Sequence, residues 1–371
     1  MGNEPDLFKT SAQGIMRPGS WSETDYVKEW NTKIESIKGA LSKNCGAEWV
    51  SKQRFQWLAP SFAGTGNSLN PLRTWNAQLN KSGVIGKFSS HKYALFNQWS
   101  YIKMLTPRSY IGGATQPGVT LGGTLMNHTR TASSISSHVS SRNALRAAGL
   151  TLPYILGETN SLYNQGAPDL SNSFGAALWG LDFNLLCAAN SISQVFMHQG
   201  TNFRYASWQP KSTNKTTKGT KAPYYGNIAV AAALGDLSKG SVRVANVPMQ
   251  NEKYAGYAIF GDQVLKRMVL VNLNQYNYTD VATKQRGNPS WKITVPKACA
   301  GTGTVQRLMA NGSNAITGIS FNGMSYNYEL DEGRPKVLSN ATRDEVVKVG
   351  DDGGLSVNVP DSSAAVVQLV C

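Results

Sequence analysis

Two glutamates occupy sequence settings that could do chemistry. Glu4 lies in the motif Gly-Asn-Glu-Pro (residues 2–5), and Glu158 lies in Leu-Gly-Glu-Thr-Asn (residues 156–160), after an apolar run. A pair of carboxyl groups, one protonated and one ionised, can cleave a glycosidic bond; in the retaining reaction they lie about 5 to 5.5 Å apart. The two motifs therefore suggest an acid/base and a nucleophile, provided that the fold brings them together.

The elements around these motifs alternate between helices and strands from residue 22 to residue 210. Ser22 and Asp25 form a capping box before apolar residues at helical spacing, and residues 174–189 form a second apolar helix face. Further helices are expected near residues 72–81 and 135–148, and strands at 55–59, 84–88, 152–156 and 195–197. Repeated strand and helix units predict parallel strands with right-handed crossovers. The carboxyl ends of such strands converge in a barrel, where Glu158 would lie.

From about residue 241 the pattern changes to alternating apolar and polar residues. Turn residues at 261–262, 322–323 and 352–354 separate the expected strands, which lie at 241–246, 254–260, 267–273, 291–295, 304–309 and 364–370. Short alternating strands of this kind are typical of a β-sandwich. A helix from Tyr224 would connect the two parts. We therefore expect an α/β domain over residues 1–238 and an all-β sandwich over residues 239–371.

The composition is that of a globular chain. Its 371 residues are 41% hydrophobic, enough to bury a substantial core in two domains. No apolar stretch reaches the roughly 18 to 20 residues of a membrane span, and no signal-peptide pattern occurs in this chain. The formal charge of +14 attracts anions. Because the basic stretch from Lys211 to Lys221 lacks interleaved aromatic residues, we expect no nucleic-acid partner and no membrane partner.

The four cysteines have no spacing typical of a metal site or a redox pair, so we expect no metal and no cofactor. Cys299 and Cys371 both lie in the all-β part and are the best candidates for a disulfide. Cys187 lies in an apolar helix, where a thiol is more often buried and inert.

Five Asn-x-Ser/Thr sequons favour a secreted glycoprotein, although such triplets also arise by chance in Asn- and Ser-rich sequences. They begin at Asn127, Asn214, Asn277, Asn311 and Asn340.

The residues that follow Glu158 resemble those of a known family. Gly157-Glu158-Thr159-Asn160-Ser161 is followed by Gly166, by Ser171-Asn172 and by Ala-Ala-Leu-Trp-Gly-Leu-Asp at residues 176–182. Together with Asn-Glu-Pro at residues 3–5, this pattern is similar to glycoside hydrolase family 79, over essentially the whole chain. The similarity is to the fungal-type secreted members of that family, which belongs to clan A and contains β-glucuronidases and heparanase-like enzymes.

The resemblance implies a retaining hydrolase that acts on β-glucuronides through a covalent glycosyl-enzyme. Glu158 would be the nucleophile at the end of the seventh strand of a (β/α)8 TIM barrel, and Glu4 the acid/base at the end of the fourth. Asn3 would bond the sugar 2-hydroxyl, a contact that strengthens in the transition state. His91 and Tyr93 would line the subsite at the end of the sixth strand, with Tyr93 holding Glu158 ionised.

The resemblance also implies how the carboxylate of a glucuronide is bound. Tyr163, Gly166 and Tyr205 match the positions at which the family holds this group, and tyrosine hydroxyls and backbone amides can bind a carboxylate without a formal cation. Arg204 is a further candidate, with a surface arginine as the alternative. His198 resembles the histidine of the eighth strand, in a structural or a functional role. The partner would be a β-glucuronide or another glycan that contains uronic acid.

The chain departs from the family pattern at its start, because it begins where the fourth barrel strand ends. We expect Met1 to be an internal residue of a longer secreted protein, and the barrel in this chain to be partial, from the end of strand 4 through strand and helix 8. No strand precedes Glu4 to hold it, so the fragment is expected to have impaired activity. Two alternatives stay open: a non-catalytic carbohydrate-associated fragment, and a related clan A exo-glycosidase such as an arabinofuranosidase.

Overall fold

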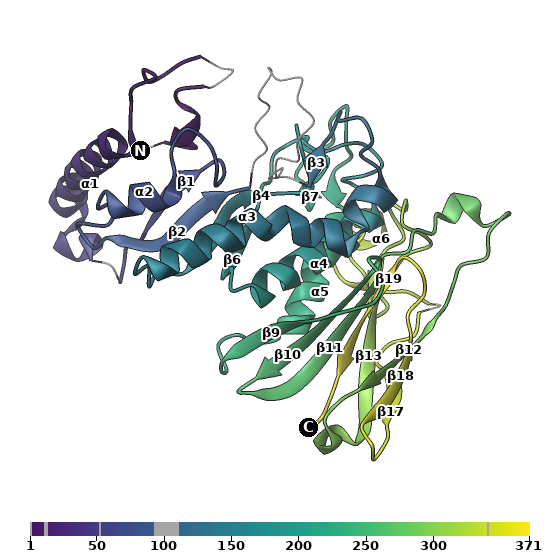
Figure 1. Ribbon diagram of the computed structural model, residues 1–371. Helices are drawn as coiled ribbons and strands as arrows, with labels where there is room; N and C mark the ends of the chain where they lie inside the picture. Colours follow the sequence, from purple (N-terminus) through teal and green to yellow (C-terminus); the bar gives the residue numbers. More distant parts are fainter. Residues whose placement is uncertain (1, 11–13, 52, 93–110, 340) are drawn as a thin grey trace. The chain divides into compact units, whose positions relative to one another are not determined.

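The computed structural model describes residues 2–10, 14–51, 53–92, 111–339 and 341–371 (Figure 1). It divides into two compact units, each assembled from separated stretches of the chain. The first unit takes its described residues from 1–110, 134–159 and 190–197, and the second from 111–133, 160–189 and 198–371. The domain boundary expected at residue 238 stays a prediction.

A four-stranded parallel sheet forms the centre of the first unit. Its strands are β1 (Trp57–Phe62), β2 (Ile85–His91), β4 (Tyr154–Thr159) and β6 (Gln194–Met197), hydrogen-bonded in that order. The parallel strands predicted from the repeated strand and helix units are therefore confirmed. Phe88 and Tyr154 stack in the core with ring centroids 5.6 Å apart, and Ile155 and Leu156 are fully buried. Such continuous apolar runs are typical of parallel strands that are covered on both faces.

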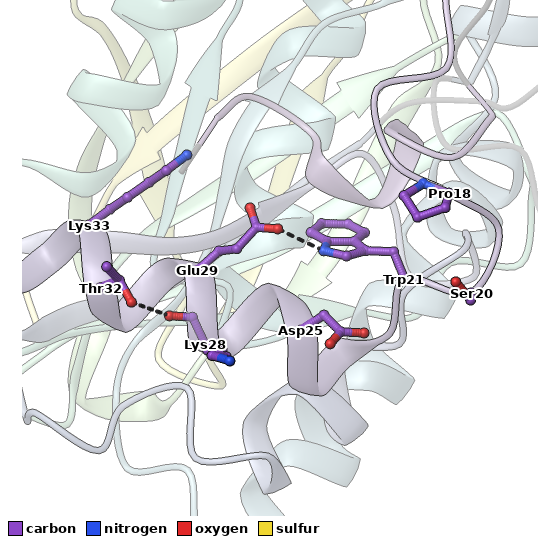
Figure 2. A pocket seen from close by; sticks show the side chains of 8 residues that line it. All are labelled: Pro18, Ser20, Trp21, Asp25, Lys28, Glu29, Thr32 and Lys33. Carbon is purple, nitrogen blue, oxygen red and sulfur yellow. Dashed lines mark hydrogen bonds between the residues drawn. The ribbon is translucent and has the colours of Figure 1, made fainter.

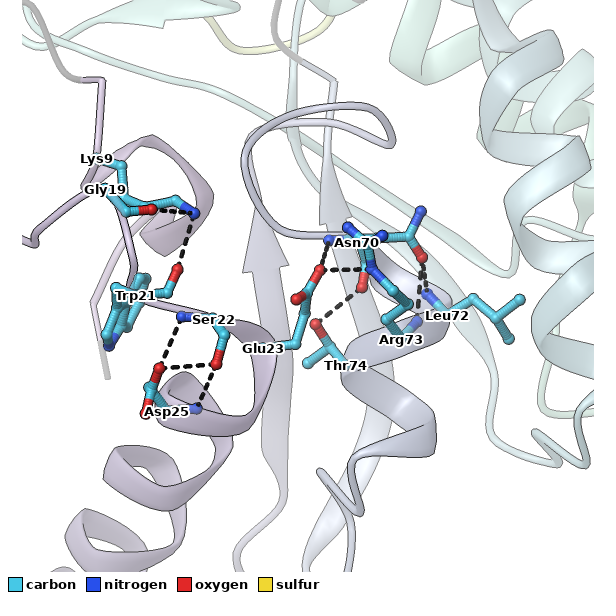
Figure 3. Close-up of polar contacts among 10 residues, drawn as sticks. All are labelled: Lys9, Gly19, Trp21, Ser22, Glu23, Asp25, Asn70, Leu72, Arg73 and Thr74. Atoms are coloured by element: carbon cyan, nitrogen blue, oxygen red, sulfur yellow. Dashed lines mark hydrogen bonds and ion pairs between the residues drawn. The ribbon is translucent and has the colours of Figure 1, made fainter.

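Helix α1 (Glu23–Cys45) begins at the predicted capping box. Figure 3 shows its reciprocal bonds: the Asp25 N–H donates to Ser22 Oγ at 3.3 Å, and the Ser22 N–H donates to Asp25 Oδ2 at 2.9 Å. These bonds satisfy two backbone donors that a helix start would leave unpaired. The apolar spacing places one face in the core, where Tyr26, Trp30 and Ile34 are at most 3% exposed.

Helix α2 (Pro71–Asn76) is shorter than the predicted segment 72–81. Asn70 caps it, because its Oδ1 accepts from the Leu72 and Arg73 N–H groups at 3.0 Å each (Figure 3). The helix ends early because Gln78 takes a φ of 70°, which a helix cannot continue through. The first unit also contains most of α3 (His128–Ala147), which covers the predicted helix 135–148.

The second unit contains two apolar helices, α4 (Phe174–Ala189) and α5 (Ala222–Leu234). Both match their predicted positions, and α4 has the predicted bounds. Gly226 of α5 lies directly against Ala177 of α4, because a Cβ at residue 226 would overlap the carbonyl oxygen of Ala177. A glycine at this point therefore allows the two helix backbones to pack closely.

A large antiparallel sheet makes up most of the second unit. Its main path runs β12-β18-β17-β13-β19-β11-β10-β9. The strands on that path are β9 (Val242–Val247), β10 (Tyr254–Gly261), β11 (Val264–Asn272), β12 (Ser290–Thr294), β13 (Gly301–Met309), β17 (Glu345–Val349), β18 (Gly354–Asn358) and β19 (Ser363–Gln368). Although all these strands belong to one hydrogen-bonded sheet, the sheet curls on itself: Tyr254 of β10 packs against Trp291 of β12, with ring centroids 4.5 Å apart. The two ends of the sheet thus enclose one core, as in a sandwich.

Shorter elements complete the second unit and the connections. The short strands are β3 (Gly112–Gly113), β5 (Leu162–Tyr163), β7 (Trp208–Gln209), β8 (Gly219–Thr220), β14 (Ser320–Phe321), β15 (Met324–Ser325) and β16 (Lys336–Val337). The short helical turns are η1 (Pro5–Leu7), η2 (Ala47–Val50), η3 (Leu121–Leu125), η4 (Tyr278–Asp280), η5 (Lys297–Cys299) and α6 (Tyr328–Asp331).

A disulfide joins Cys299 and Cys371, the pair that the sequence indicated. Cys187 is fully buried in α4, as expected. None of the helices in the described part of the chain combines the length and the apolar character that a membrane crossing requires.

Candidate active site

Glu4 is held by strand β1, which lies further along the chain. The Glu4 N–H donates to the carbonyl oxygen of Ser61 at 3.1 Å. That carbonyl is available because Ser61 is a bulge: Pro60 pairs with Ser89 and Phe62 with Ser90, which leaves Ser61 as an extra residue. Bulges next to active sites commonly redirect a strand in this way. The expectation that nothing holds Glu4 is therefore wrong, because β1 supplies the partner that the sequence did not indicate.

Glu158 lies within β4 rather than after it, because the strand continues to Thr159. A second bulge occurs here: Ser90 pairs with Leu156 and His91 with Glu158, so that Gly157 is the extra residue. The Glu158 carbonyl accepts from the Lys92 N–H at 2.8 Å, which fixes the backbone directly beside the carboxylate. The Glu158 side chain is 17% exposed, so a substrate can reach it.

His91 brings the two carboxylates together. Its Nδ1 lies 3.1 Å from Glu4 Oε1 and 3.8 Å from Glu158 Oε2. The sum of these distances, 6.9 Å, is an upper bound on the separation of the two carboxylate oxygens. Two carboxylates this close to one histidine can act on the same glycosidic bond.

Gly157 permits this arrangement because it has no side chain. A Cβ at residue 157 would overlap Ser89 Oγ and would lie 3.3 Å and 3.4 Å from two atoms of the His91 ring. Its φ is not in the left-handed region, so the requirement is for space rather than for backbone freedom. The glycine of the Gly-Glu motif therefore makes room for the histidine that contacts both carboxylates.

An aromatic clamp holds the chain segment that follows Glu4. Phe8 stacks on Trp21, with ring centroids 6.1 Å apart, and the Arg17 guanidinium lies within 6 Å of both rings. Glu29 of α1 secures the clamp, because it accepts from Trp21 Nε1 at 3.0 Å and pairs with Arg17 at 2.8 Å. Gly2 lies against the end of the Phe8 ring, where a Cβ at residue 2 would lie 2.7 Å from Cζ. The clamp therefore also contacts the motif around Glu4.

Figure 2 shows a hollow beside this clamp, on the surface of α1. It is lined by Pro18, Ser20, Trp21, Asp25, Lys28, Glu29, Thr32 and Lys33. Neither Glu4, His91 nor Glu158 lines it, so it is not the place where the two carboxylates meet.

The second unit brings together a different group of predicted residues. The hydroxyl of Tyr205 lies 2.9 Å from His198 Nδ1, and Tyr205 is 3% exposed. Gly166 has a φ of 79°, and a Cβ there would lie 3.1 Å from the Tyr205 ring and 2.7 Å from Ser171. Gly166, Tyr205 and His198 thus form one packed group, in which Gly166 supplies a left-handed backbone and a close approach.

The remaining predicted residues are placed individually. Tyr163 lies on β5, with its ring against Gly113 of the paired strand β3. Asn3 is exposed, next to Glu4. Tyr93 lies outside the described residues. Among those that are described, no group of three or more His, Cys, Asp or Glu side chains is arranged to hold a metal ion.

The sequons differ in their surroundings. Asn214 and Asn311 are exposed, and Asn277 is half-buried. Asn127 is 5% exposed and caps α3, because its Oδ1 accepts from the Arg130 N–H at 2.9 Å, so its burial argues against a glycan there. Asn340 lies outside the described residues.

Two functional features gave no signal in the sequence. Ser61 provides the backbone acceptor for Glu4, and Asp6 is fully buried beside the same strand end. Neither residue lies in a periodic pattern, because each is placed by pairing between distant segments. A Pro-Asp-Leu sequence is otherwise typical of an exposed turn.

Comparisons with known proteins support the resemblance. A family model described as the glycosyl hydrolase family 79 C-terminal beta domain matches residues 256–366. A β-glucuronidase of Aspergillus niger is 51% identical over 381 residues, covering 100% of this chain and 66% of the relative. A β-glucuronidase of Neurospora crassa is 43% identical over 405 residues, covering 100% of this chain and 69% of the relative. This chain thus spans about two thirds of the length of these relatives.

Solved structures show the same fold. A 4-O-α-L-rhamnosyl-β-D-glucuronidase of Fusarium oxysporum, in complex with Rha-GlcA, matches 100% of this chain and 69% of its own, with a TM-score of 0.74 and 23% identity. A family 51 α-L-arabinofuranosidase of Bifidobacterium longum matches 100% of this chain and 66% of its own, with a TM-score of 0.58 and 12% identity. At these identities the likeness extends to the fold alone, and the predicted fold class is confirmed. From the extent of its identity with the two fungal proteins and the match of its C-terminal region, the chain belongs to glycoside hydrolase family 79.

Proposed function

We propose that this protein is a retaining glycoside hydrolase that acts on β-glucuronides. The observation that supports the proposal is that His91 Nδ1 lies 3.1 Å from Glu4 and 3.8 Å from Glu158, so that both carboxylates lie beside one histidine. The two relatives named β-glucuronidases favour a glucuronide over an arabinofuranoside as the substrate.

In the first step, the Glu158 carboxylate attacks the anomeric carbon while the glycosidic C–O bond breaks. The electron pair of that bond goes to the leaving oxygen, which takes the proton of Glu4. In the second step, Glu4 accepts a proton from water, the water oxygen bonds the anomeric carbon, and the bond to Glu158 breaks. Glu4 ends protonated and Glu158 ionised, so both groups are restored.

His91 orients the acid/base in this scheme. A hydrogen on Nδ1 donates to Glu4 Oε1, which leaves Oε2 to carry the proton that the leaving oxygen takes. Because His91 is 4% exposed and packs over Gly157, its ring cannot turn freely away from Glu4. A fixed donor of this kind holds the acid in one geometry.

Residues for recognition are proposed in each unit separately. In the first unit, Asn3, next to Glu4, would bond a sugar 2-hydroxyl. In the second unit, Tyr163, Gly166 and Tyr205 would bind a carboxylate. If His198 Nδ1 carries a hydrogen, it donates to the Tyr205 oxygen at 2.9 Å, and the phenol hydrogen can then point to the carboxylate. The resulting class of substrate is a glucuronide or a glycan that contains uronic acid.

Two features of the second unit support an extracellular location. The disulfide between Cys299 and Cys371 persists in an oxidising compartment, and the exposed sequons at Asn214 and Asn311 can accept glycans there. Mass spectrometry of the protein isolated from its natural host would detect both modifications. An unmodified Asn214 and Asn311 with reduced thiols would contradict the proposed location.

The proposed activity is tested on the full chain with two substrates, 4-nitrophenyl β-glucuronide and 4-nitrophenyl α-L-arabinofuranoside. We expect release of 4-nitrophenol from its β-glucuronide, with the β anomer of glucuronic acid as the first product seen by proton NMR. Glu158→Gln abolishes turnover, and Glu4→Gln lowers kcat on the order of 10²- to 10⁴-fold. Glu23→Gln is the control and should keep its activity. It alters a carboxylate that accepts a hydrogen bond from the N–H of Asn70, the residue that caps α2.

Other outcomes select other functions. Preference for 4-nitrophenyl α-L-arabinofuranoside would select an arabinofuranosidase. No turnover of any of these glycosides, by protein that is folded by circular dichroism, would select a non-catalytic carbohydrate-associated role. An α anomer as the first product would contradict the retaining mechanism.

A further inference from the structure

Asp6 is a fully buried acid two residues after Glu4. It lies in η1 and is 0% exposed. Its Oδ1 accepts from the Ala63 N–H at 2.8 Å, its Oδ2 accepts from Asn67 Nδ2 at 2.6 Å, and its carbonyl oxygen accepts from Ser68 Oγ. All three partners lie in the loop that follows β1, so Asp6 joins the Glu4 segment to the end of that strand.

Glu4 needs such an anchor because its backbone is in a left-handed conformation, with φ 55° and ψ 53°. For a residue with a side chain this conformation is unfavourable and persists only where the surroundings impose it. On one side of the strained residue, the Glu4 N–H bonds Ser61. On the other side, the Asp6 side chain makes the bonds that keep the segment from relaxing.

Burying a carboxyl group costs more free energy than burying a neutral amide or hydroxyl, although these groups also accept hydrogen bonds. Burial raises the pKa of Asp6 to about 7, against the opposing effect of the bonds from Ala63 and Asn67, and the charge of Glu4 raises it further. Tyr26 of α1 also faces it, and the Asp6 charge contributes to raising the pKa of that phenol. Burial and the neighbouring Glu4 charge therefore favour the protonated, neutral form of Asp6.

We propose that Asp6 is a positioning residue for the acid/base: its buried carboxyl holds Glu4 in the left-handed conformation beside His91, so that the Glu4 carboxyl can give its proton to the leaving oxygen. This rests on the proposed function. Asp6 does not touch the substrate in this proposal, and it acts only through Glu4. Its effect is therefore largest where the reaction depends most on proton donation.

The dependence on the leaving group provides the test. Departure of 2,4-dinitrophenolate needs almost no proton, whereas departure of phenolate needs one. We expect Asp6→Asn in the full chain to lower kcat/KM for phenyl β-glucuronide on the order of tenfold or more, and for the dinitrophenyl substrate by less than about threefold.

Two further variants separate positioning from general loss of structure. Asp6→Asn combined with Asn67→Asp returns one carboxylate to the hydrogen-bonded pair and restores at least part of the lost activity. Glu23→Gln weakens the same unit at a carboxylate bonded to the Asn70 N–H and to Arg73, each at 2.9 Å, and slows both substrates equally if at all.

The outcomes are distinguishable. Equal slowing of both substrates by Asp6→Asn, with no recovery in the double variant, would overturn the inference while leaving the proposed function intact. A wild-type chain that hydrolyses neither substrate would overturn the proposed function, and the role of Asp6 with it.

Discussion

The Nδ1 atom of His91 lies 3.1 Å from Oε1 of Glu4, although 87 positions separate the two residues in the chain. His91 ends β2, and Glu4 is bonded to the bulge in the neighbouring strand β1. The contact therefore depends on the pairing of two parallel strands and on the bulge at Ser61 near the end of β1. The same irregularity on β4 places Glu158 3.8 Å from the same nitrogen.

Replacement of His91 should impair catalysis more than binding. In His91→Ala the acid/base loses its fixed donor, and a misplacement of about 1 Å at a catalytic group can lower the rate on the order of 10²-fold. We expect kcat for 4-nitrophenyl β-glucuronide to fall by about that factor with little change in KM. The thermal midpoint of the variant is the control for folding, and a kcat within twofold of wild type would contradict the orienting role.

A methyl group at residue 157 should disturb the site sterically. Gly157→Ala introduces a Cβ that overlaps Ser89 Oγ and crowds the His91 ring, and overpacking of this kind costs typically about 1 to 3 kcal/mol. We expect a lower free energy of unfolding in urea and a loss of activity. Combining it with Ser89→Gly removes the larger overlap and should recover stability; a double variant no more stable than Gly157→Ala would show that the clash lies elsewhere.

Stability should depend on pH through His128. Burial lowers the pKa of His128, but the hydrogen bond at 2.8 Å and the charge of Asp182 outweigh it, so that the pKa is raised above 6.5. A histidine with a raised folded pKa contributes stability that is fully present below its unfolded value and is lost as the pH rises through the folded value. Tyr257, whose hydroxyl also donates to Asp182, keeps its proton throughout this range because burial raises its pKa well above 10.

The comparison of wild type with His128→Gln isolates this contribution. Thermal midpoints measured from about pH 5.5 to 8.5 should differ most at the acidic end and converge as the pH rises. Asp6, whose pKa is raised to about 7, also contributes less to folding stability as the pH rises, but its contribution is the same in both proteins. A difference that is constant across the range would show that the charge on His128 is not involved.

The disulfide should stabilise the second unit. Cys299 and Cys371 close a loop across a sequence separation of 72 residues, and a native disulfide of this kind contributes typically about 2 to 4 kcal/mol. Cys371→Ser should lower the thermal midpoint, and dithiothreitol should lower that of the wild type to a similar value. Cys45→Ser is the matched control, since Cys45 is exposed on α1; an equal effect of that variant would contradict the assignment.

Local patterns determined much of the fold. The capping box at Ser22 predicted the start of α1, and the apolar run from Phe174 to Ala189 predicted α4 with its observed bounds. These features follow from interactions within a few residues, which a sequence contains directly. The strands β17 and β18 were missed because they are short, and because Val346 is an apolar residue that is 71% exposed and obscures the alternation.

At the candidate site, too, some features could be predicted from the sequence and others only from the tertiary structure. The residue types and motifs around Glu4 and Glu158 indicated two carboxylates and a family by themselves, because they depend only on the order of residues. The anchor on Glu4, the histidine between the carboxylates and the burial of Asp6 were decided by the tertiary structure. Each of these depends on which backbone groups a bulge leaves unpaired and on which distant segment meets them, and no local pattern of residues encodes that.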